Sequence, residues 1–252
     1  MFVDSHCHVD SCSYEDIEAV LRRAKDNKVG IIIVNGYDRK SNYEVIELVK
    51  KYDMVYGAIG WQPSEIGEIT EEDYAFLEEH INDDKIVAIG EIGLDYYYDN
   101  YDKVKQIDAF KRQIKIANKN NKPIIVHSRE AIQDTYDIVK EMKARGVIHC
   151  YSGSLEMALE FIKVGFCLGI GGICTFKNAK NIIRVIKGVS IDNIVLETDA
   201  PYLTPEPYRG KKNEPMYIPI IARKVAELKS LTEQEVMEVT TRSICRVFDK
   251  FL

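Results

Sequence analysis

The stretch of sequence that decides the fold is residues 124–149, IIVHSREAIQDTYDIVKEMKARGVIH. It begins with an apolar run at 124–126, continues through a helix-like segment at 131–145, and closes on a second apolar run at 147–148. Both runs are nearly continuous in Ile and Val, which is typical of parallel strands buried on both faces. The stretch therefore predicts a βαβ unit, in which a helix carries the chain back to a neighbouring parallel strand.

The same unit recurs along the chain. Strand-like runs occur at 2–3, 30–34, 55–59, 86–89, 124–126, 147–148, 166–170 and 194–196. Helix-like segments follow them at 14–27, 41–51, 71–81, 103–120, 131–145, 155–164, 179–187 and 216–228. Eight units in 252 residues give 252/8 = 31.5 residues each, which fits a closed (β/α)₈ barrel of about 250 residues.

The alternative fold is an open, doubly wound sheet. Such a sheet would carry a Gly-rich phosphate turn after its first strand, and no G-x-G-x-x-G pattern follows residues 2–3. One more helix is expected at the end, because 232–235 has the pattern of a capping box and an apolar stripe follows at Val236, Val239, Ile244, Val247 and Phe248. We predict an α/β fold, a TIM-type (β/α)₈ barrel with an additional C-terminal helix, in a single domain over 1–252.

Composition excludes several classes of protein. The chain is 46% hydrophobic and 29% charged, with a net charge of −6, which argues against a disordered chain and against a wholly basic nucleic-acid coat. No apolar stretch approaches the roughly 18 residues that a membrane span needs. The six cysteines form no Cys-x-x-Cys pair and the first residues do not resemble a secretory signal. We therefore expect a cytoplasmic protein with reduced thiols and no membrane association.

Four of the five histidines lie where a predicted strand ends. His6 and His8 follow the first strand on one face, His127 ends the fifth and His149 ends the sixth. Two carboxylates lie at equivalent places, Glu91 at the end of the fourth strand and Asp199 after the eighth. The carboxyl ends of barrel strands converge on the face where active sites are found, so we expect these side chains to meet there.

Four imidazoles and two carboxylates are a donor set that suits first-row divalent metals. A single histidine at a strand end is usually structural, and it is the joint placement that indicates a metal site. One ion rarely takes six protein ligands, so two ions that share a bridging carboxylate are favoured. Two such ions can stabilise the attacking and the leaving oxygens of a displacement. The donor set leaves Mg, Mn and Zn open as the metal.

Six motifs carry a resemblance to a known family. They are DSHCH at 4–8, GEIGLDY at 90–96, PIIVHSR at 123–129, HCYSG at 149–153, ETDAPYL at 197–203 and RGKKNEP at 209–215. In this order the chain resembles the TatD family of metal-dependent deoxyribonucleases. The resemblance implies that His6, His8 and Asp199 hold one ion, that Glu91 bridges, and that His127 and His149 hold the second. It also implies a DNA substrate, cleaved as a 3′–5′ exonuclease would, at single-stranded or frayed 3′ ends.

The chain departs from the family at one position. The family has Gly-x-His-Pro after the third strand, and this sequence has Gly60-Trp61-Gln62-Pro63. Gln62 can donate a hydrogen bond to a substrate phosphate but cannot carry a positive charge. Rate, metal dependence or substrate preference is therefore expected to differ.

Further residues near the predicted ligands suit a nucleic-acid substrate. Arg129 and Arg209, with Lys211 and Lys212, are expected to meet phosphates. Tyr151 and Tyr202 are expected to stack on bases. For catalysis we assign the general base to Asp199, beside the bridging Glu91. The contacts expected from the sequence therefore lie at Gln62, Arg129, Tyr151, Tyr202 and Arg209.

Two other functions stay open at this point. One is a metal-dependent amidohydrolase or esterase that acts on a small metabolite, although no lysine that could be carboxylated stands at the end of the fourth strand. The other is a catalytically weak metal-binding or scaffold protein, for which Gln62 is the one hint. Turnover of DNA, a cyclic amide and a phosphomonoester would separate these functions. The sequence indicates no protein partner.

Overall fold

Eight parallel strands form one sheet that curls into a nearly closed barrel. The computed structural model describes residues 1–99 and 101–251. Each strand pairs in parallel with the next along the chain. The strands are β1 (Phe2–Cys7), β2 (Val29–Asn35), β3 (Val55–Ile59), β4 (Ile86–Asp95), β5 (Ile124–Arg129), β6 (Gly146–Ile148), β7 (Phe166–Ile170) and β8 (Ile194–Leu196).

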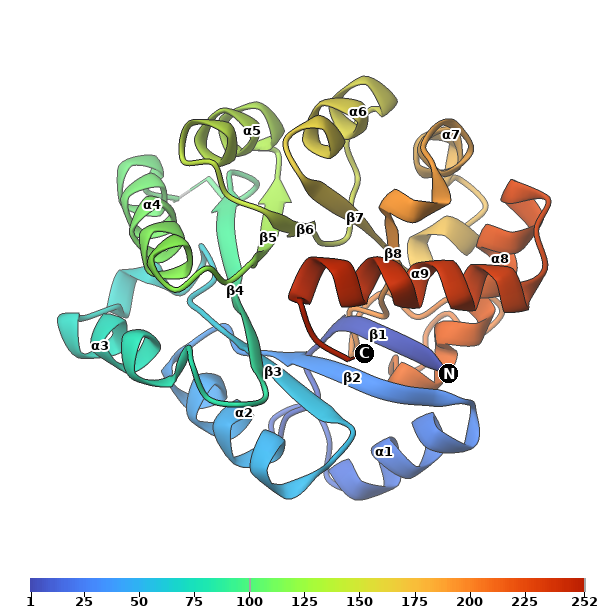
Figure 1. Ribbon diagram of the computed structural model, residues 1–252, viewed down its shortest axis with the longest axis horizontal. Helices are drawn as coiled ribbons and strands as arrows, with labels where there is room; N and C mark the ends of the chain where they lie inside the picture. The colour runs from blue at the N-terminus through green and yellow to red at the C-terminus, as the bar shows by residue number, and fades with distance from the viewer. Residues whose placement is uncertain (100, 252) are drawn as a thin grey trace.

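Helices surround the barrel and follow its strands in turn, as Figure 1 shows. They are α1 (Ile17–Asp26), α2 (Arg39–Lys51), α3 (Glu71–His80), α4 (Lys103–Lys119), α5 (Ile132–Glu141), α6 (Leu155–Lys163), α7 (Lys180–Gly188), α8 (Ile218–Lys229) and α9 (Glu233–Phe248). Short 3₁₀ turns lie at η1 (Ile66–Glu68), η2 (Gly172–Thr175), η3 (Ile191–Asn193) and η4 (Pro215–Tyr217). The prediction of a (β/α)₈ barrel with an extra C-terminal helix is confirmed.

Backbone hydrogen bonds join the first strand to the segment that follows the eighth. The Asp199 amide donates to the His6 carbonyl at 3.0 Å, and the His8 amide donates to the Ala200 carbonyl at 2.7 Å. These bonds bring Asp199 beside His6 of β1 and His8, which follows that strand. Closure of the barrel therefore assembles residues that lie almost 200 positions apart in the sequence.

Two strands run further than the sequence suggested. β4 continues to Asp95 and β5 to Arg129, so Glu91 and His127 lie within their strands and the prediction that they end them was wrong. His6 likewise lies within β1 rather than after it. Gly93 is part of the reason. It has φ +148, and a Cβ on it would lie 2.0 Å from the His127 carbonyl oxygen. Only glycine allows β4 to lie this close to β5.

The helix boundaries follow their capping residues. α1 begins at Ile17 rather than at 14, because the Asp16 side chain accepts the Ala19 amide and caps the helix there. The expected capping box at the start of α9 is confirmed, with Thr232 and Glu235 bonded reciprocally.

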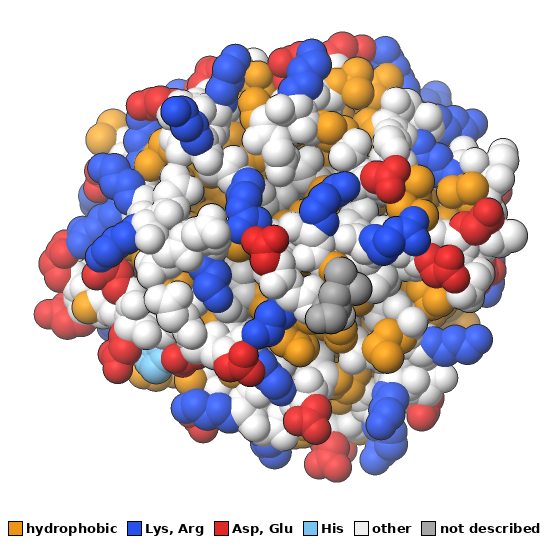
Figure 2. Space-filling view, in the orientation of Figure 1, with side chains coloured by type: hydrophobic (Ala, Val, Ile, Leu, Met, Phe, Trp, Pro, Cys, Tyr) orange, Lys and Arg blue, Asp and Glu red, His pale blue; other side chains and the backbone are white. Residues whose placement is uncertain are grey.

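The interior of the barrel is apolar at the end where the strands begin. Every strand contributes to one buried cluster there, and α9 adds Ile244, Val247 and Phe248. Figure 1 shows α9 lying across the centre of the ring of helices, with both termini close to it. On this face, basic and acidic side chains are interspersed (Figure 2). The helices of the described residues include none that is long and apolar enough to cross a membrane.

Candidate metal centre

The six predicted ligands lie together where the strands end. On one side, Nε2 of His6 lies 3.2 Å from Nε2 of His8. On the other, Nδ1 of His127 lies 3.2 Å from Nε2 of His149. Oδ1 of Asp199 lies 3.6 Å from Nε2 of His6 and 3.8 Å from Nε2 of His8. The histidines therefore form two pairs, one with Asp199 beside it.

Glu91 lies between the two pairs of histidines. Its Oε2 is 3.6 Å from Nε2 of His6 and 3.2 Å from Nε2 of His8. Its Oε1 is 2.9 Å from Nδ1 of His127 and 3.0 Å from Nε2 of His149. Each carboxylate oxygen thus faces a different pair. The carboxylate is almost fully buried, so its charge is compensated by these groups rather than by bulk water.

The second ring nitrogen of two histidines faces a hydrogen-bond acceptor. Nδ1 of His8 lies 2.9 Å from the Asn35 carbonyl oxygen, and Nε2 of His127 lies 3.1 Å from Oδ2 of Asp95. Such outer partners fix the tautomer and the orientation of a metal-ligating imidazole. Nδ1 of His149 lies 3.8 Å from Oε1 of Glu197, beyond hydrogen-bond distance, and this buried nitrogen has no hydrogen-bond partner among the described residues.

Sequence reasoning gave no role to Asp95 or Glu197, although both lie inside the motifs quoted above. A signal was present, because Asp95 follows Glu91 by four residues and Glu197 precedes Asp199 by two. Even spacings of this kind place side chains on one face of a regular strand.

Burial and neighbouring charges shift the pKa values in the centre. Burial alone would raise the pKa of Glu91, but His149 and the other histidines hold it well below its usual range. Burial opposes the charged form of His8, yet its bond to Glu91 raises the pKa of His8 to about 9. Burial, followed by the charge of His149, lowers the pKa of His6. Burial raises the pKa of Asp199.

Two buried acids, Asp4 and Glu197, accept hydrogen bonds from residues next to the predicted ligands. Asp4 is fully buried and accepts the Thr198 amide at 2.9 Å and the Thr198 hydroxyl at 2.5 Å. Burial raises the pKa of Asp4 to about 7. Glu197 is also fully buried and accepts the Cys150 amide. Gly169 leaves room for Glu197, because a Cβ there would lie 2.1 Å from the carboxylate.

Side-chain amides from the helices hold the segment that carries Gln62. Asn42 of α2 donates to the Gly60 carbonyl at 2.8 Å and accepts the Gly60 amide at 2.9 Å. Gln113 of α4 accepts the Trp61 amide at 2.8 Å and donates to the Trp61 carbonyl at 3.1 Å. Both amides are buried, so the backbone that leads into half-buried Gln62 is fixed.

The predicted substrate contacts lie on the rim above the centre, with one exception. The Arg129 guanidinium lies 3.5 Å from the centroid of the Tyr97 ring, and the Arg209 guanidinium lies 3.9 Å from that of Phe176. Tyr202 is 62% exposed, and its ring centroid lies 6.5 Å from that of His8. These side chains are free to meet a ligand.

The exception is Tyr151, which is only 3% exposed. Its hydroxyl donates to the Ser154 carbonyl at 2.7 Å and its ring packs edge-on against Phe161. No ring face is left for a base, so the prediction that Tyr151 stacks on the substrate was wrong. Lys212 is also engaged, since its ammonium donates to the Ser13 carbonyl at 2.5 Å.

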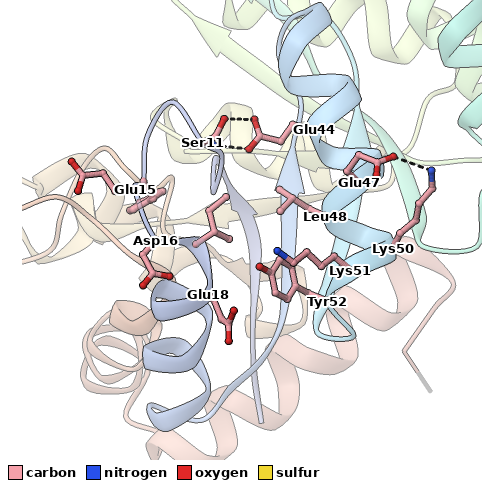
Figure 3. A pocket seen from close by; sticks show the side chains of 12 residues that line it. Ser11, Glu15, Asp16, Glu18, Glu44, Glu47, Leu48, Lys50, Lys51 and Tyr52 are labelled. Atoms are coloured by element: carbon pink, nitrogen blue, oxygen red, sulfur yellow. Dashed lines mark hydrogen bonds and ion pairs between the residues drawn. The ribbon is translucent and has the colours of Figure 1, made fainter.

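A groove on the outer flank is separate from the centre. It lies beside α1 and α2 (Figure 3), has a volume of about 600 Å³, and none of the six predicted ligands lines it. Two of its acidic side chains already have local partners. Glu44 accepts the Ser11 amide and hydroxyl, and Glu47 pairs with Lys50. The barrel mouth therefore remains the one place where the predicted residues meet.

Many of the donor atoms have a spacing that suits a metal ion. Neighbouring ligands about 2.0–2.2 Å from one ion lie about 3–3.6 Å from one another. Three groups have donor atoms within 4.8 Å of one another: His6, His8 and Glu91; Glu91, His127 and His149; and His6, His149 and Asp199. The residues present thus fit divalent metal ions.

Comparison with known proteins agrees with this geometry. The family model described as TatD related DNase matches residues 3–249. This chain belongs to the TatD-related DNase family. It is 44% identical to the uncharacterized metal-dependent hydrolase YabD of Bacillus subtilis, over 98% of this chain and 99% of the relative. It is 36% identical to the uncharacterized metal-dependent hydrolase YcfH of Escherichia coli K12, over 98% and 95%.

A solved TatD structure has the same fold. The crystal structure of YjjV, a TatD homologue from Escherichia coli K12, superposes with a TM-score of 0.94 at 29% identity, covering 99% of this chain and 98% of that one. The protein is therefore a TatD-family metal-dependent hydrolase, with several groups of His, Glu and Asp side chains able to bind metal.

Proposed function

We propose that the protein is a deoxyribonuclease that hydrolyses phosphodiester bonds of DNA at a centre of two divalent ions, Mg, Mn or Zn. The observation that carries the proposal is the position of Glu91, whose two oxygens face different pairs of histidines. A carboxylate placed in this way is suited to bridge two ions. In support, the chain matches the TatD related DNase family over almost its full length.

The residues divide into two ligand groups. His6, His8 and Asp199 would hold one ion, His127 and His149 the second, with Glu91 shared. Bound there, two divalent ions supply Lewis-acid activation of water and phosphate, and stabilise the attacking and leaving oxygens. Asp95 would orient the imidazole of His127 from outside, because its Oδ2 lies 3.1 Å from Nε2 of that ring.

Asp199 has a second task in this proposal. Its Oδ1 faces the His6 and His8 pair, and the side chain is 13% exposed at the mouth. A carboxylate at that place can accept the proton of the attacking water at its other oxygen. Asp199 would therefore be the general base as well as a ligand.

Four rim residues would hold the DNA strand. Arg129 and Arg209 would neutralise phosphates on two sides of the centre, because a guanidinium matches phosphate geometry. Tyr202 would stack on a base. Gln62 would donate a hydrogen bond to a phosphate oxygen through its amide. We also propose that the strand is taken by its single-stranded or frayed 3′ end.

The test is a nuclease assay of protein stripped of metal, with Mg²⁺, Mn²⁺ or Zn²⁺ added back. Single-stranded and duplex oligonucleotides with a 5′ label would be used. We expect stepwise shortening from the 3′ end only after metal is restored. A cyclic amide and a phosphomonoester serve as competing substrates. Turnover of the amide without turnover of DNA would overturn the proposal in favour of an amidohydrolase.

A further inference from the structure

A side cavity lies beside the metal centre, between the segment that follows β3 and the segment that follows β4. It has a volume of about 340 Å³, and Pro63, Ile66, Gly67, Asp95, Tyr98 and Tyr101 are among the residues that line it. We propose that this side cavity binds the base of the nucleotide next to the scissile phosphate. The inference rests on the proposed function and adds a base-binding subsite beside the centre.

The walls of the side cavity suit a flat aromatic ring. The segment after β3 contributes apolar Pro63 and Ile66, and the segment after β4 contributes Tyr98 and Tyr101. Tyr98 is 53% exposed, and Tyr101, whose ring stacks on that of Tyr96 with centroids 4.8 Å apart, is 39% exposed. Both rings therefore keep surface for a ligand. Exposed aromatic side chains beside a site provide base stacking without preference for sequence, since every base has a π face.

The inner end of the side cavity is tied to the metal centre. Asp95 lines the side cavity and also lies 3.1 Å from His127. Gln106 of α4 fixes the Asp95 backbone by two bonds, accepting its amide and donating to its carbonyl, each at 2.9 Å. A base in the side cavity would therefore belong to a nucleotide directly beside the centre.

A cation lies beside the aromatic wall of the side cavity. The Arg129 guanidinium is 3.5 Å from the ring centroid of Tyr97 and 5.7 Å from that of Tyr98. Arg129 is the last residue of β5, the strand that also carries His127, so the proposal places the phosphate of that nucleotide against this guanidinium. A cavity of this size holds a small ligand, and a single base is a ligand of that scale.

The experiment uses the metal-loaded protein and a short DNA strand with phosphorothioate linkages, which resist hydrolysis. The strand ends in 2-aminopurine, whose fluorescence falls when the base stacks. We expect quenching on binding to the parent protein. Tyr98→Leu with Tyr101→Leu should abolish the quenching and weaken binding roughly tenfold or more, the scale of base–aromatic stacking.

Two further variants make the result specific. Gly67→Trp should have the same effect by filling the side cavity, because a Cβ at Gly67 meets nothing within 4 Å and the larger side chain is tolerated there. Tyr43→Leu is the control, since Tyr43 is 57% exposed but lies on α2, outside the side cavity. Binding of the strand to Tyr43→Leu should quench the 2-aminopurine fluorescence as strongly as binding to the parent protein does.

Persistent quenching in both the Tyr98/Tyr101 variant and Gly67→Trp would overturn the inference. Equal KM for natural strands and strands with an abasic terminal residue would also overturn it. Failure of the proposed function looks different. In that case the parent does not hydrolyse DNA at any metal, whereas quenching in the side cavity would still identify a nucleoside site.

Discussion

The two ends of the barrel interior carry opposite chemistry on the same strands. Near their starts, β5, β6 and β8 point Ile125, Val147 and Val195 into the apolar cluster that α9 covers. Two residues later stand His127, on the same face of β5, and His149 and Glu197, the first residues after β6 and β8. The same strands therefore form both ends of the barrel interior: the end that α9 covers (the covered end) and the end that carries the predicted metal ligands (the mouth). The two ends differ in the side chains that the strands carry.

The difference separates stability from chemistry. The covered end buries apolar surface at about 25 cal/mol per Å², with no charge to desolvate. The mouth buries Asp4, Glu91 and Glu197 almost completely, which opposes folding unless each charge is compensated or neutralised. Changes at the mouth should therefore affect metal binding and catalysis, and changes at the covered end should affect the free energy of unfolding.

The largest effect should come from Glu91→Ala at the mouth. Loss of the carboxylate between the two histidine pairs should remove most bound metal and reduce DNA hydrolysis to background. The fold should remain, because the covered end is untouched. Metal content, nuclease rate and thermal melting of the metal-free protein check this. A variant that cuts DNA at the parent rate would exclude a two-metal mechanism.

At the covered end, Phe248→Ala should lower the free energy of unfolding by about 3 kcal/mol, the lower part of the range for buried Phe→Ala, because Phe248 ends α9 and its surroundings can adjust. Metal content and kcat per folded molecule should stay unchanged. Denaturant unfolding and metal analysis measure both quantities. Loss of metal from folded Phe248→Ala protein would show that the two ends are not independent.

A third effect separates the two tasks of Asp199. Asp199→Asn keeps the shape and one possible ligand oxygen but loses the basicity. We expect kcat to fall roughly 10²-fold, the scale of general-base loss, while metal content and DNA affinity largely remain. Single-turnover kinetics and melting provide the measurements. If Asp199 merely holds the turn before Pro201, stability would fall slightly and kcat would stay near that of the parent.

The barrel and the grouping of the six predicted ligands follow from the sequence because their signals are local. Near-continuous Ile and Val runs indicate buried parallel strands, and four histidines stand at or near the ends of such runs. Closure of a barrel then brings these positions together whatever the exact strand boundaries are. Glu91 shows this, since it lies inside β4 rather than at its end and still faces the centre.

The remaining features depend on contacts between distant elements. Burial of Tyr151 requires Phe161 of α6 beside it, and nothing in the HCYSG motif reports that neighbour. The role of Asp95 requires Gln106 from α4 and His127 from β5. The extension of β4 requires Gly93 to meet the β5 backbone. Each depends on tertiary packing, which short motifs do not encode.

A smaller effect is expected from the carboxylate that lies beside His127 at the mouth. Asp95→Asn removes the carboxylate beside His127, so affinity for one of the two ions should fall about 10–100-fold, as for other outer partners of metal ligands. Calorimetric titration of metal into stripped protein measures this. Asp134→Asn is the matched control, because Asp134 accepts the Tyr96 hydroxyl at 2.9 Å outside the donor groups. Unchanged affinity at both ions would assign Asp95 to the fold alone.

The smallest effect is expected in the ring of helices that surrounds the barrel (the outer ring). It lies away from both ends of the barrel interior, so it serves as a reference for changes at either end. Asp73 of α3 accepts the Thr70 amide at 2.8 Å and pairs with the Arg39 guanidinium at 2.7 Å. Burial alone would raise the pKa of Asp73, but the bonds from Arg39 and Thr70 lower it below its ordinary value. The folded state therefore favours the ionised form, and this stabilisation is present above about pH 4 and is lost as the pH falls through the lower, folded value.

Asp73→Asn should accordingly lower the free energy of unfolding by about 1 kcal/mol at neutral pH, the scale of a lost helix cap, and its difference from the parent should shrink to near zero in acid. Denaturant unfolding from pH 7 to pH 2 measures this difference. A difference that stays constant down to pH 2 would show that the charge of Asp73 is not the cause. The variant leaves every group at the mouth in place. If its free energy of unfolding depends on acid pH only when metal is bound, that dependence comes from the metal ligands. The pH dependence of unfolding then separates the outer ring from the mouth, while the apolar cluster under α9 should contribute equally at every pH.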